Sequence, residues 1–380
     1  MSVPKLRFRG FTEEWEKKKL GEITKRVKGN DGRMNLPTLT ISAKNGWMRQ
    51  EDRFSSNIAG AEQKNYTLLS KGELSYNHGN SKLAKYGVVY SLKHINEALV
   101  PKVYHSFKTT KFFYNLFIEY LFMSKIPDRE LRKLISSGAR MDGLLNIGYD
   151  EFMGINVILP EFEEQQKIGD FFTLLDKRIE QQEQKIALLK DYKKAMMQKI
   201  FSQKIRFKDD NGNDYPDWEE KKLGKICRVK SSQLTNNVVE EIGKYPVYGA
   251  NSIVGYTENY EVNKYVSIVK DGAGVGRIAF INNKSSVLGT LQYLIGIEIT
   301  TEFLYVLLSN VNFKLYQTGT TIPHIYFKDY SKMIIDIPCQ LEQEKISSFL
   351  FAMDLNLENQ EAILNNLKEQ KQGLLRKMFV

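Results

Sequence analysis

The chain has 380 residues, a length that predicts two or three domains rather than one. Its 42% hydrophobic residues exclude extended disorder, and its formal net charge of +10 favours polyanionic partners. The two cysteines, Cys227 and Cys339, are too few for a disulfide framework or a thiolate metal site. With no apolar run of the kind that crosses a membrane or directs secretion, the composition predicts a cytoplasmic protein.

The opening of the chain is repeated in its second half. The stretch WEKKKLGEI at 15–23 reappears as WEEKKLGKI at 218–226, and each follows an Arg-Phe pair. A longer match aligns 160–201 with 338–379 without a gap, identical at about 15 of roughly 42 positions. The repeats predict four segments: a variable domain at 1–160, a long helix at 161–203, a second variable domain at 204–338 and a second long helix at 339–380.

Both copies of the longer repeat carry apolar residues at alternating spacings of four and three, which predicts a coiled-coil seam. Two stripes of matching pattern favour packing against each other over burial in a globular core. A two-fold relation between the copies would make the helices antiparallel, with Gln182 and Gln360 near the middle of the seam. The predicted seam consists of Ile168, Phe172, Leu175, Ile179, Gln182, Ile186, Leu189, Ile346, Leu350, Met353, Leu357, Gln360, Leu364 and Leu367.

The variable domains show mixed patterns. Alternating apolar residues at 264–270 and 275–280 flank a glycine-rich turn and predict a hairpin. Further strands are expected at 74–77, 87–90, 156–159 and 245–248, and core helices at 114–123 and 303–308. The predicted fold class is therefore α+β, with two similar loop-rich α/β domains separated by two long helices that form an antiparallel coiled coil, in a pseudo-two-fold internal repeat.

Motifs for catalysis are not found. Gly272, Gly274 and Gly276 fit neither a dinucleotide fingerprint nor a P-loop, because no helix follows them. The four histidines show no metal-ligand spacing, and the chain has no nucleophile elbow and no motif that would hold a flipped adenine. These observations predict a protein without catalytic residues or a metal site.

Loops of both variable domains carry side chains suited to phosphates and to base edges in the major groove. Each residue taken alone is more often a solvated loop residue than a DNA contact. In the first domain the DNA-binding candidates are Lys44, Asn45, Arg49, Arg53, Asn77, His78, Asn80, Lys82 and Arg140. In the second domain they are Asn251, Ser252, Arg277, Gln292, Thr320, Thr321 and His324.

Over essentially its whole length the sequence resembles the specificity subunits of type I restriction-modification enzymes. The resemblance rests on the repeated Trp-x-x-Lys-Lys-Leu-Gly opening, YPVYGAN at 245–251, KDGAGVG at 270–276, TIPHI at 321–325 and the Pro-x-x-x-Glu-Gln-x-Lys-Ile start of both long helices. It implies two target recognition domains, at 1–160 and 204–338, that each read one half of a split, asymmetric DNA sequence. The first domain lacks the YPVYGAN and TIPH elements and keeps only LNI at 145–147.

The resemblance also implies partners and cofactors. Double-stranded DNA, two methyltransferase subunits that modify adenine at N6 and two restriction and motor subunits would assemble with this chain. S-adenosylmethionine, ATP and magnesium would bind to those subunits only, and none to this chain. Two alternatives stay open: a coiled-coil scaffold that binds protein partners without reading DNA, and an inactive donor copy whose recognition domains are shuffled into a relative.

Overall fold

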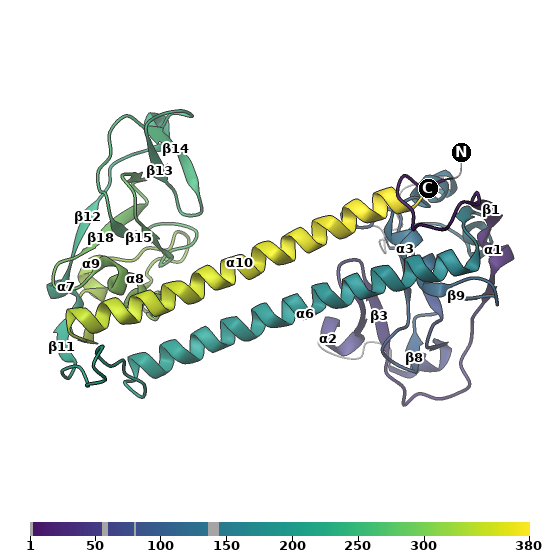
Figure 1. Ribbon diagram of the computed structural model, residues 1–380, viewed down its shortest axis with the longest axis horizontal. Helices are drawn as coiled ribbons and strands as arrows, with labels where there is room; N and C mark the ends of the chain where they lie inside the picture. The colour runs from purple at the N-terminus through teal and green to yellow at the C-terminus, as the bar shows by residue number, and fades with distance from the viewer. Residues whose placement is uncertain (1–2, 55–59, 80, 136–143) are drawn as a thin grey trace. The chain divides into compact units, whose positions relative to one another are not determined.

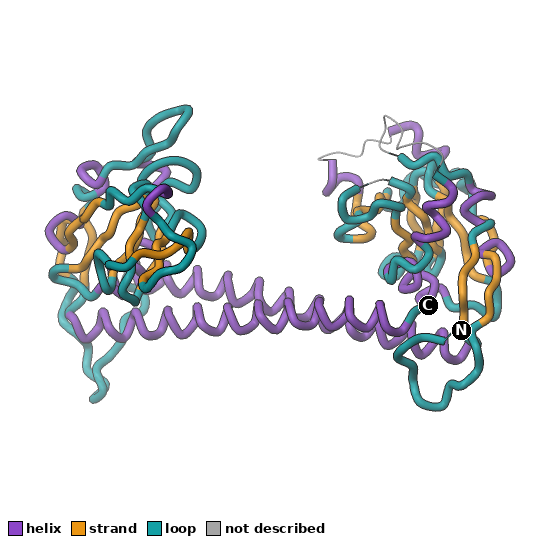
Figure 2. The backbone as a smooth tube through the Cα atoms, turned by 90° about the horizontal axis from the view of Figure 1, so that it is seen from above, coloured by secondary structure: helices purple, strands orange, loops and turns teal. Residues whose placement is uncertain are grey.

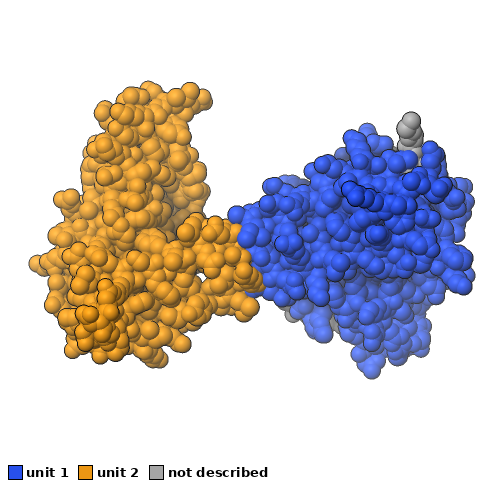
Figure 3. Space-filling view, in the orientation of Figure 1, with its two compact units in different colours: residues 1–184, 362–380 blue, residues 185–361 orange. Residues whose placement is uncertain are grey.

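The computed structural model describes residues 3–54, 60–79, 81–135 and 144–380. The chain divides into two compact units, one made of Met1–Gln184 with Ala362–Val380 and the other of Lys185–Glu361 (Figure 3). We call them unit 1 and unit 2. Each contains one variable domain, here called the first module (3–159) and the second module (204–337). Each also contains parts of the two long helices α6 (Phe162–Phe201) and α10 (Gln340–Met378), labelled in Figure 1.

The first module is built on a four-stranded antiparallel sheet in the order β2-β9-β6-β7, accompanied by the strand pairs β1-β10, β3-β4 and β5-β8. The strands are orange in Figure 2. Their bounds are β1 Glu16–Lys19, β2 Thr24–Arg26, β3 Leu39–Ser42, β4 Gly46–Arg49, β5 Thr67–Ser70, β6 Leu74–Asn77, β7 Val88–Ser91, β8 Glu97–Val100, β9 His105–Thr109 and β10 Asn156–Leu159. The helices are α1 Leu20–Ile23, α2 Gln50–Phe54, η1 Gly60–Asn65, α3 Asn115–Met123, α4 Asp128–Leu134 and α5 Tyr149–Met153.

The second module repeats this plan with a four-stranded sheet in the order β12-β18-β15-β16, a three-stranded sheet β14-β13-β17 and the pair β11-β19. Its strands are β11 Glu219–Lys222, β12 Cys227–Ser231, β13 Tyr245–Tyr248, β14 Ile253–Thr257, β15 Tyr265–Val269, β16 Ile278–Ile281, β17 Ser286–Val287, β18 Leu291–Gly296 and β19 Ile334–Ile337. The helices are α7 Leu223–Ile226, η2 Asn236–Val238, α8 Thr301–Ser309, η3 Phe313–Tyr316 and α9 Phe327–Tyr330.

The predicted fold class and the predicted hairpin are confirmed. Strands β15 and β16 pair antiparallel, with Tyr265 opposite Ile281. The strands expected at 74–77, 156–159 and 245–248 have those bounds. Strand β7 begins one residue later than predicted because Gly87 belongs to the turn, with a φ of 80°. A Cβ at Gly87 would lie 2.5 Å from the carbonyl oxygen of Asn77, so the turn requires glycine.

The glutamate that opens each long helix binds the arginine that opens the module. The Arg7 guanidinium donates two hydrogen bonds of 2.7 Å to Glu164, whose side chain is fully buried. The equivalent pair in unit 2 is Arg206 and Glu342, at 3.3 and 2.8 Å, and Glu342 is also fully buried. The repeated Arg-Phe and Glu-Gln motifs therefore form a buried charge pair that joins each module to the start of its helix.

The glutamine that follows each of these glutamates fixes a second helix of the module. The side-chain oxygen of Gln165 accepts a hydrogen bond from the backbone N–H of Tyr114, and that of Gln343 accepts one from Thr300, both at 3.0 Å. Tyr114 and Thr300 directly precede α3 and α8, which each have nine residues. The two modules thus place α3 and α8 at equivalent positions, residue by residue, beside the long helices.

The repeated tryptophan packs at the other end of each long helix. The ring centroid of Trp15 lies 5.7 Å from that of Phe117 and 6.4 Å from that of Phe379, beyond the end of α10. Trp218 makes the equivalent edge-on contact with Phe201, the last residue of α6, at 6.4 Å. The hydrophobic core of each unit therefore includes the start of one long helix and the end of the other.

Ion pairs show that the long helices run antiparallel. They are Asp176–Lys371 and Glu183–Lys368 in unit 1, and Lys193–Asp354 and Lys190–Glu361 in unit 2. In each unit the residue number rises along one helix as it falls along the other. The pairs of unit 2 are also the residue-by-residue equivalents of those of unit 1 in the gapless repeat, as a pseudo-two-fold relation requires.

The predicted seam residues face inward along both helices. Ile168, Phe172, Ile186, Ile346, Leu350 and Leu367 are buried, and the other eight predicted seam residues are half-buried. Leu174, Leu188 and Leu355, which lie outside the predicted seam, are each more than half exposed. The burial follows the heptad pattern of the sequence.

Candidate nucleic-acid interface

The polar loops of the second module gather at one edge of its four-stranded sheet. Strand β15 ends and β16 begins there, and residues 270–277 connect them. The 318–325 segment lies against this connection. Gly272 N–H donates to the Pro323 carbonyl, and Ile325 N–H donates to the Lys270 carbonyl, both at 2.9 Å. Two motifs that are about 50 residues apart in sequence thus form one surface.

His324 is held within this surface by backbone and side-chain contacts. Its N–H and carbonyl exchange hydrogen bonds of 2.8 and 2.9 Å with Thr318, and its Nδ1 lies 2.7 Å from the Asp271 carboxylate. About a third of the His324 side chain is exposed. The predicted residues Thr320 and Thr321 are exposed in the same turn.

A second pair of predicted residues meets on the adjoining loop. The Arg277 guanidinium donates to the side-chain oxygen of Asn251 and, at 3.2 Å, to the Ala250 carbonyl. Arg277, Asn251 and Ser252 are all exposed. Gln292 of β18 is half-buried and donates at 2.9 Å to Ser231 at the end of β12. All seven predicted residues of the second module therefore lie on this edge or on the loops that join it.

In the first module four predicted residues line one cavity. Lys44, Arg53, Asn77 and Lys82 surround a hollow of about 780 Å³ between the β3-β4 turn, α2 and the loop after β6. The Asn77 side chain donates at 3.1 Å to the carbonyl of Ile41. The long cationic side chains Lys44, Arg53 and Lys82 are exposed around this cavity, an arrangement suited to a polyanion.

The remaining predictions for the first module have other surroundings. Asn45 is exposed beside Lys44, while Arg49 is paired with Glu51 at 3.1 Å. His78 is 5% exposed, and its ring nitrogens lie 2.8 and 3.1 Å from two backbone carbonyl oxygens. This burial gives His78 a packing role rather than the exposed contact that the sequence predicted. Asn80 and Arg140 lie outside the described residues.

Asp271 was not among the predicted residues, although it orients His324. Its carboxylate also lies 3.4 Å from the Lys270 ammonium group. Its place within the KDGAGVG motif was a sequence signal, but the motif alone did not reveal a partner that is 53 residues away.

His105 is a second residue that the predictions missed. Its ring packs 4.9 Å from that of His78 and 5.7 Å from that of Tyr149, and its Nε2 lies 2.9 Å from the Ile147 carbonyl oxygen. Burial lowers the pKa of His105 below its ordinary value, and the nearby His78 and Arg26 lower this pKa further. The folded first module therefore favours the neutral imidazole.

This shift predicts acid sensitivity. Because the pKa of His105 is lower in the folded than in the unfolded chain, stability present above about pH 6.5 should be lost as the pH falls towards the folded pKa. His105→Gln should flatten the dependence of the urea midpoint on pH between about 5 and 7. His94→Gln, at an exposed position, is the matched control. Equal pH dependence in both variants would contradict the assignment to His105.

Within residues 3–54, 60–79, 81–135 and 144–380, no three histidine, cysteine, aspartate or glutamate residues gather as metal ligands would. No described helix combines the length and the hydrophobicity that crossing a bilayer demands.

Comparisons with known proteins agree with this architecture. Residues 215–369 match the family model of the type I restriction modification DNA specificity domain. The EcoDI type I restriction enzyme specificity subunit of Escherichia coli is 26% identical over 165 residues, which cover 42% of this chain and 37% of that protein. The matched part is therefore less than half of either chain.

Two solved structures share the fold over nearly the whole chain. The crystal structure of a type I restriction-modification system S subunit from M. genitalium superimposes with a TM-score of 0.65, 19% identity and coverage of 100% of this chain and 99% of that chain. A chain from a structural study of complex assembly and conformational transition of the type I R-M system gives a TM-score of 0.55, 16% identity and coverage of 98% and 99%.

This chain has two sheet-based modules, and each packs on the start of one long helix and the end of the other. The resemblance predicted from the sequence is confirmed by the family model, the curated relative and the shared fold. The chain is thus similar to type I restriction-modification specificity subunits, in sequence over residues 215–369 and in fold over nearly its whole length.

Proposed function

We propose that this chain is the DNA-reading, non-catalytic subunit of a type I restriction-modification system. Each module reads one half of a bipartite, asymmetric target in double-stranded DNA. Two methyltransferase subunits then modify adenine at N6, and two restriction and motor subunits cleave DNA. Cofactors bind to those subunits, and this chain works in the cytoplasm.

One observation carries the proposal. The two modules build the same order of strands in their four-stranded sheets but place different side chains around them: Arg277 with Asn251 in the second module, and Lys44 with Asn77 and Lys82 in the first. A shared framework with differing donors suits two readers of different sequences, because base edges are discriminated by donor and acceptor patterns. The net charge of +10 supports a phosphate contribution.

Methylation sequencing of host DNA with and without the gene tests this function. One bipartite adenine-methylated motif should disappear when the gene is removed and return when it is restored. An unchanged set of methylated motifs would favour the two alternatives, a protein scaffold or an inactive donor copy. A salt-insensitive or absent interaction of the assembled complex with DNA would favour the scaffold.

Arg277 is expected to contribute base contacts in the second half of the target. Arg277→Ala in the assembled complex should weaken DNA binding by about 10-fold to 100-fold and relax the motif at one position. Lys332→Ala is the matched control. It removes an exposed charge between Ser331 and Met333, whose carbonyl oxygens accept hydrogen bonds from the start of α7. If both variants weaken binding equally at every sequence, Arg277 contacts phosphate or nothing.

The purified chain alone is expected not to bind S-adenosylmethionine. Calorimetric titration should show no heat of binding until methyltransferase subunits are added, because the proposal assigns the cofactor to those subunits. Micromolar binding by this chain alone would contradict a purely DNA-reading role.

A further inference from the structure

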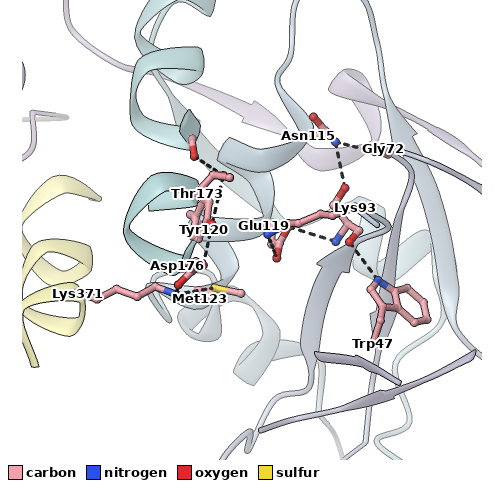
Figure 4. A network of polar contacts seen from close by, with 12 residues as sticks. Trp47, Gly72, Lys93, Asn115, Glu119, Tyr120, Met123, Thr173, Asp176 and Lys371 are labelled. Atoms are coloured by element: carbon pink, nitrogen blue, oxygen red, sulfur yellow. Dashed lines mark hydrogen bonds and ion pairs between the residues drawn. The ribbon is translucent and has the colours of Figure 1, made fainter. Parts of the chain in front are cut away.

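The first module joins the long helices through a polar network on α3 (Figure 4). The Lys93 ammonium lies 2.9 Å from the buried carboxylate of Glu119 and 5.1 Å from the ring centroid of Tyr120. The Tyr120 hydroxyl donates at 2.8 Å to Asp176 and lies 3.3 Å from the Thr173 hydroxyl. Asp176 and Thr173 both belong to α6, so the module is held to the helix by charges and hydroxyl groups.

The second module joins the helices through aromatic rings at the equivalent place. The helix pair offers the same ion pair, Lys193 with Asp354. However, the helix residue equivalent to the threonine is Phe351, and its ring stacks on Tyr305 of α8 with centroids 5.7 Å apart. The ring of Phe280 in β16 also packs on the Phe351 ring, with centroids 5.1 Å apart. The contact between the second module and the long helices is therefore apolar at this position, although the helices carry the same ion pair.

A second difference lies one helical turn earlier. A Cβ at Gly169 would lie 2.8 Å from a ring carbon of Tyr114 and 3.1 Å from the backbone nitrogen of Phe117. In unit 2 the equivalent helix residue is Ser347, which is 3% exposed, and the residue equivalent to Tyr114 is Thr300. The large side chain of Tyr114 thus faces a glycine on α6. At the equivalent place in unit 2, the smaller Thr300 corresponds to Ser347 on α10.

We propose that these two helix positions form a position key, which admits the first module only beside the start of α6 and the second only beside the start of α10. The key is Gly169 with Thr173 in unit 1 and Ser347 with Phe351 in unit 2. Residues four apart lie on one face of a helix, so each pair meets the module together. The first module beside α10 would press Tyr114 against a Cβ and leave the Tyr120 hydroxyl against a phenyl ring.

A double-mutant cycle tests the first half of the key. Gly169→Ser should lower the thermal midpoint of unit 1 by roughly 4 °C or more, because the added atom meets ring and backbone. In the Tyr114→Thr background the same change should cost clearly less. Gly373→Ser is the matched control, since a Cβ there meets nothing within 4 Å. Equal loss in both backgrounds, or no loss relative to the control, would overturn the proposal.

A grafted chain tests the whole key. The second module is replaced by a second copy of the first, and α10 either stays unchanged or carries Ser347→Gly with Phe351→Thr. The two substitutions should raise the thermal midpoint of the grafted chain and lower that of the natural chain. A change of the thermal midpoint in the same direction in both chains would refute the proposed key. Failure of the substituted graft to fold would also refute it. The readout is unfolding, so the result does not depend on DNA reading.

Discussion

Arg7→Ala is expected to destabilise unit 1 by about 3–5 kcal/mol, a large part of the stability of a typical domain. The variant removes both 2.7 Å hydrogen bonds to Glu164 and leaves this carboxylate, which has no exposed surface, without its cation. The cost of a buried unpaired charge exceeds the small net gain of forming the pair. Urea unfolding followed by circular dichroism, with hydrogen exchange at the start of α6, measures the effect.

Two further variants separate the charge from the segment around it. Arg9→Ala alters an exposed arginine two residues away and should change stability by less than about 0.5 kcal/mol. Arg7→Ala combined with Glu164→Gln should recover part of the loss, because the buried group is then neutral. A double variant as unstable as Arg7→Ala would show that packing of the arginine, not its charge, holds the segment.

Replacing the first module by the equivalent part of a relative is expected to change one half of the methylated motif completely and to leave the other half identical. Among the residues that the structure describes, the core of the first module draws on α6 and α10 and includes none of the second module. Each reader should therefore keep its own target when its neighbour is exchanged. Methylation sequencing of hosts that carry each chimera gives the result directly.

The reciprocal exchange of the second module is the matched control, and it should change only the other half-site. A change in both halves after either exchange would mean that the modules read DNA jointly. Loss of all methylation would point to a disturbed joint, which can be distinguished by the unfolding midpoint of the chimera.

The long helices and hairpins were predictable because their signals are local. Heptad spacing indicates which side of a helix is buried, and Gly272 with Gly274 marks the turn between β15 and β16. The ion pairs between the two long helices could be found only in the structure. Lys193 and Lys371 bind Asp354 and Asp176 on the opposite helix, a pairing that depends on the register between two distant segments.

The candidate site was less predictable for the same reason. His78 lies in a stretch with the composition of a loop. However, the segment around Leu145 pairs with this stretch and buries the His78 side chain. Asp271 and His324 lie 53 residues apart, and periodicity does not bring them together. Side-chain type therefore indicated the candidate DNA contacts, while their exposure depended on long-range pairings that the sequence pattern does not encode.

Unit 1 is discontinuous in sequence, because it combines Met1–Gln184 with Ala362–Val380 and all of unit 2 lies between these two parts. During synthesis the first module leaves the ribosome early, but Phe379, which covers Trp15 and Phe117, follows only after the whole second module. The apolar face of the first module must therefore stay uncovered while about 180 further residues are made, some 10 to 40 seconds at usual elongation rates. We therefore expect chaperones to bind the nascent chain mainly during this interval, and to bind the first module more than the second.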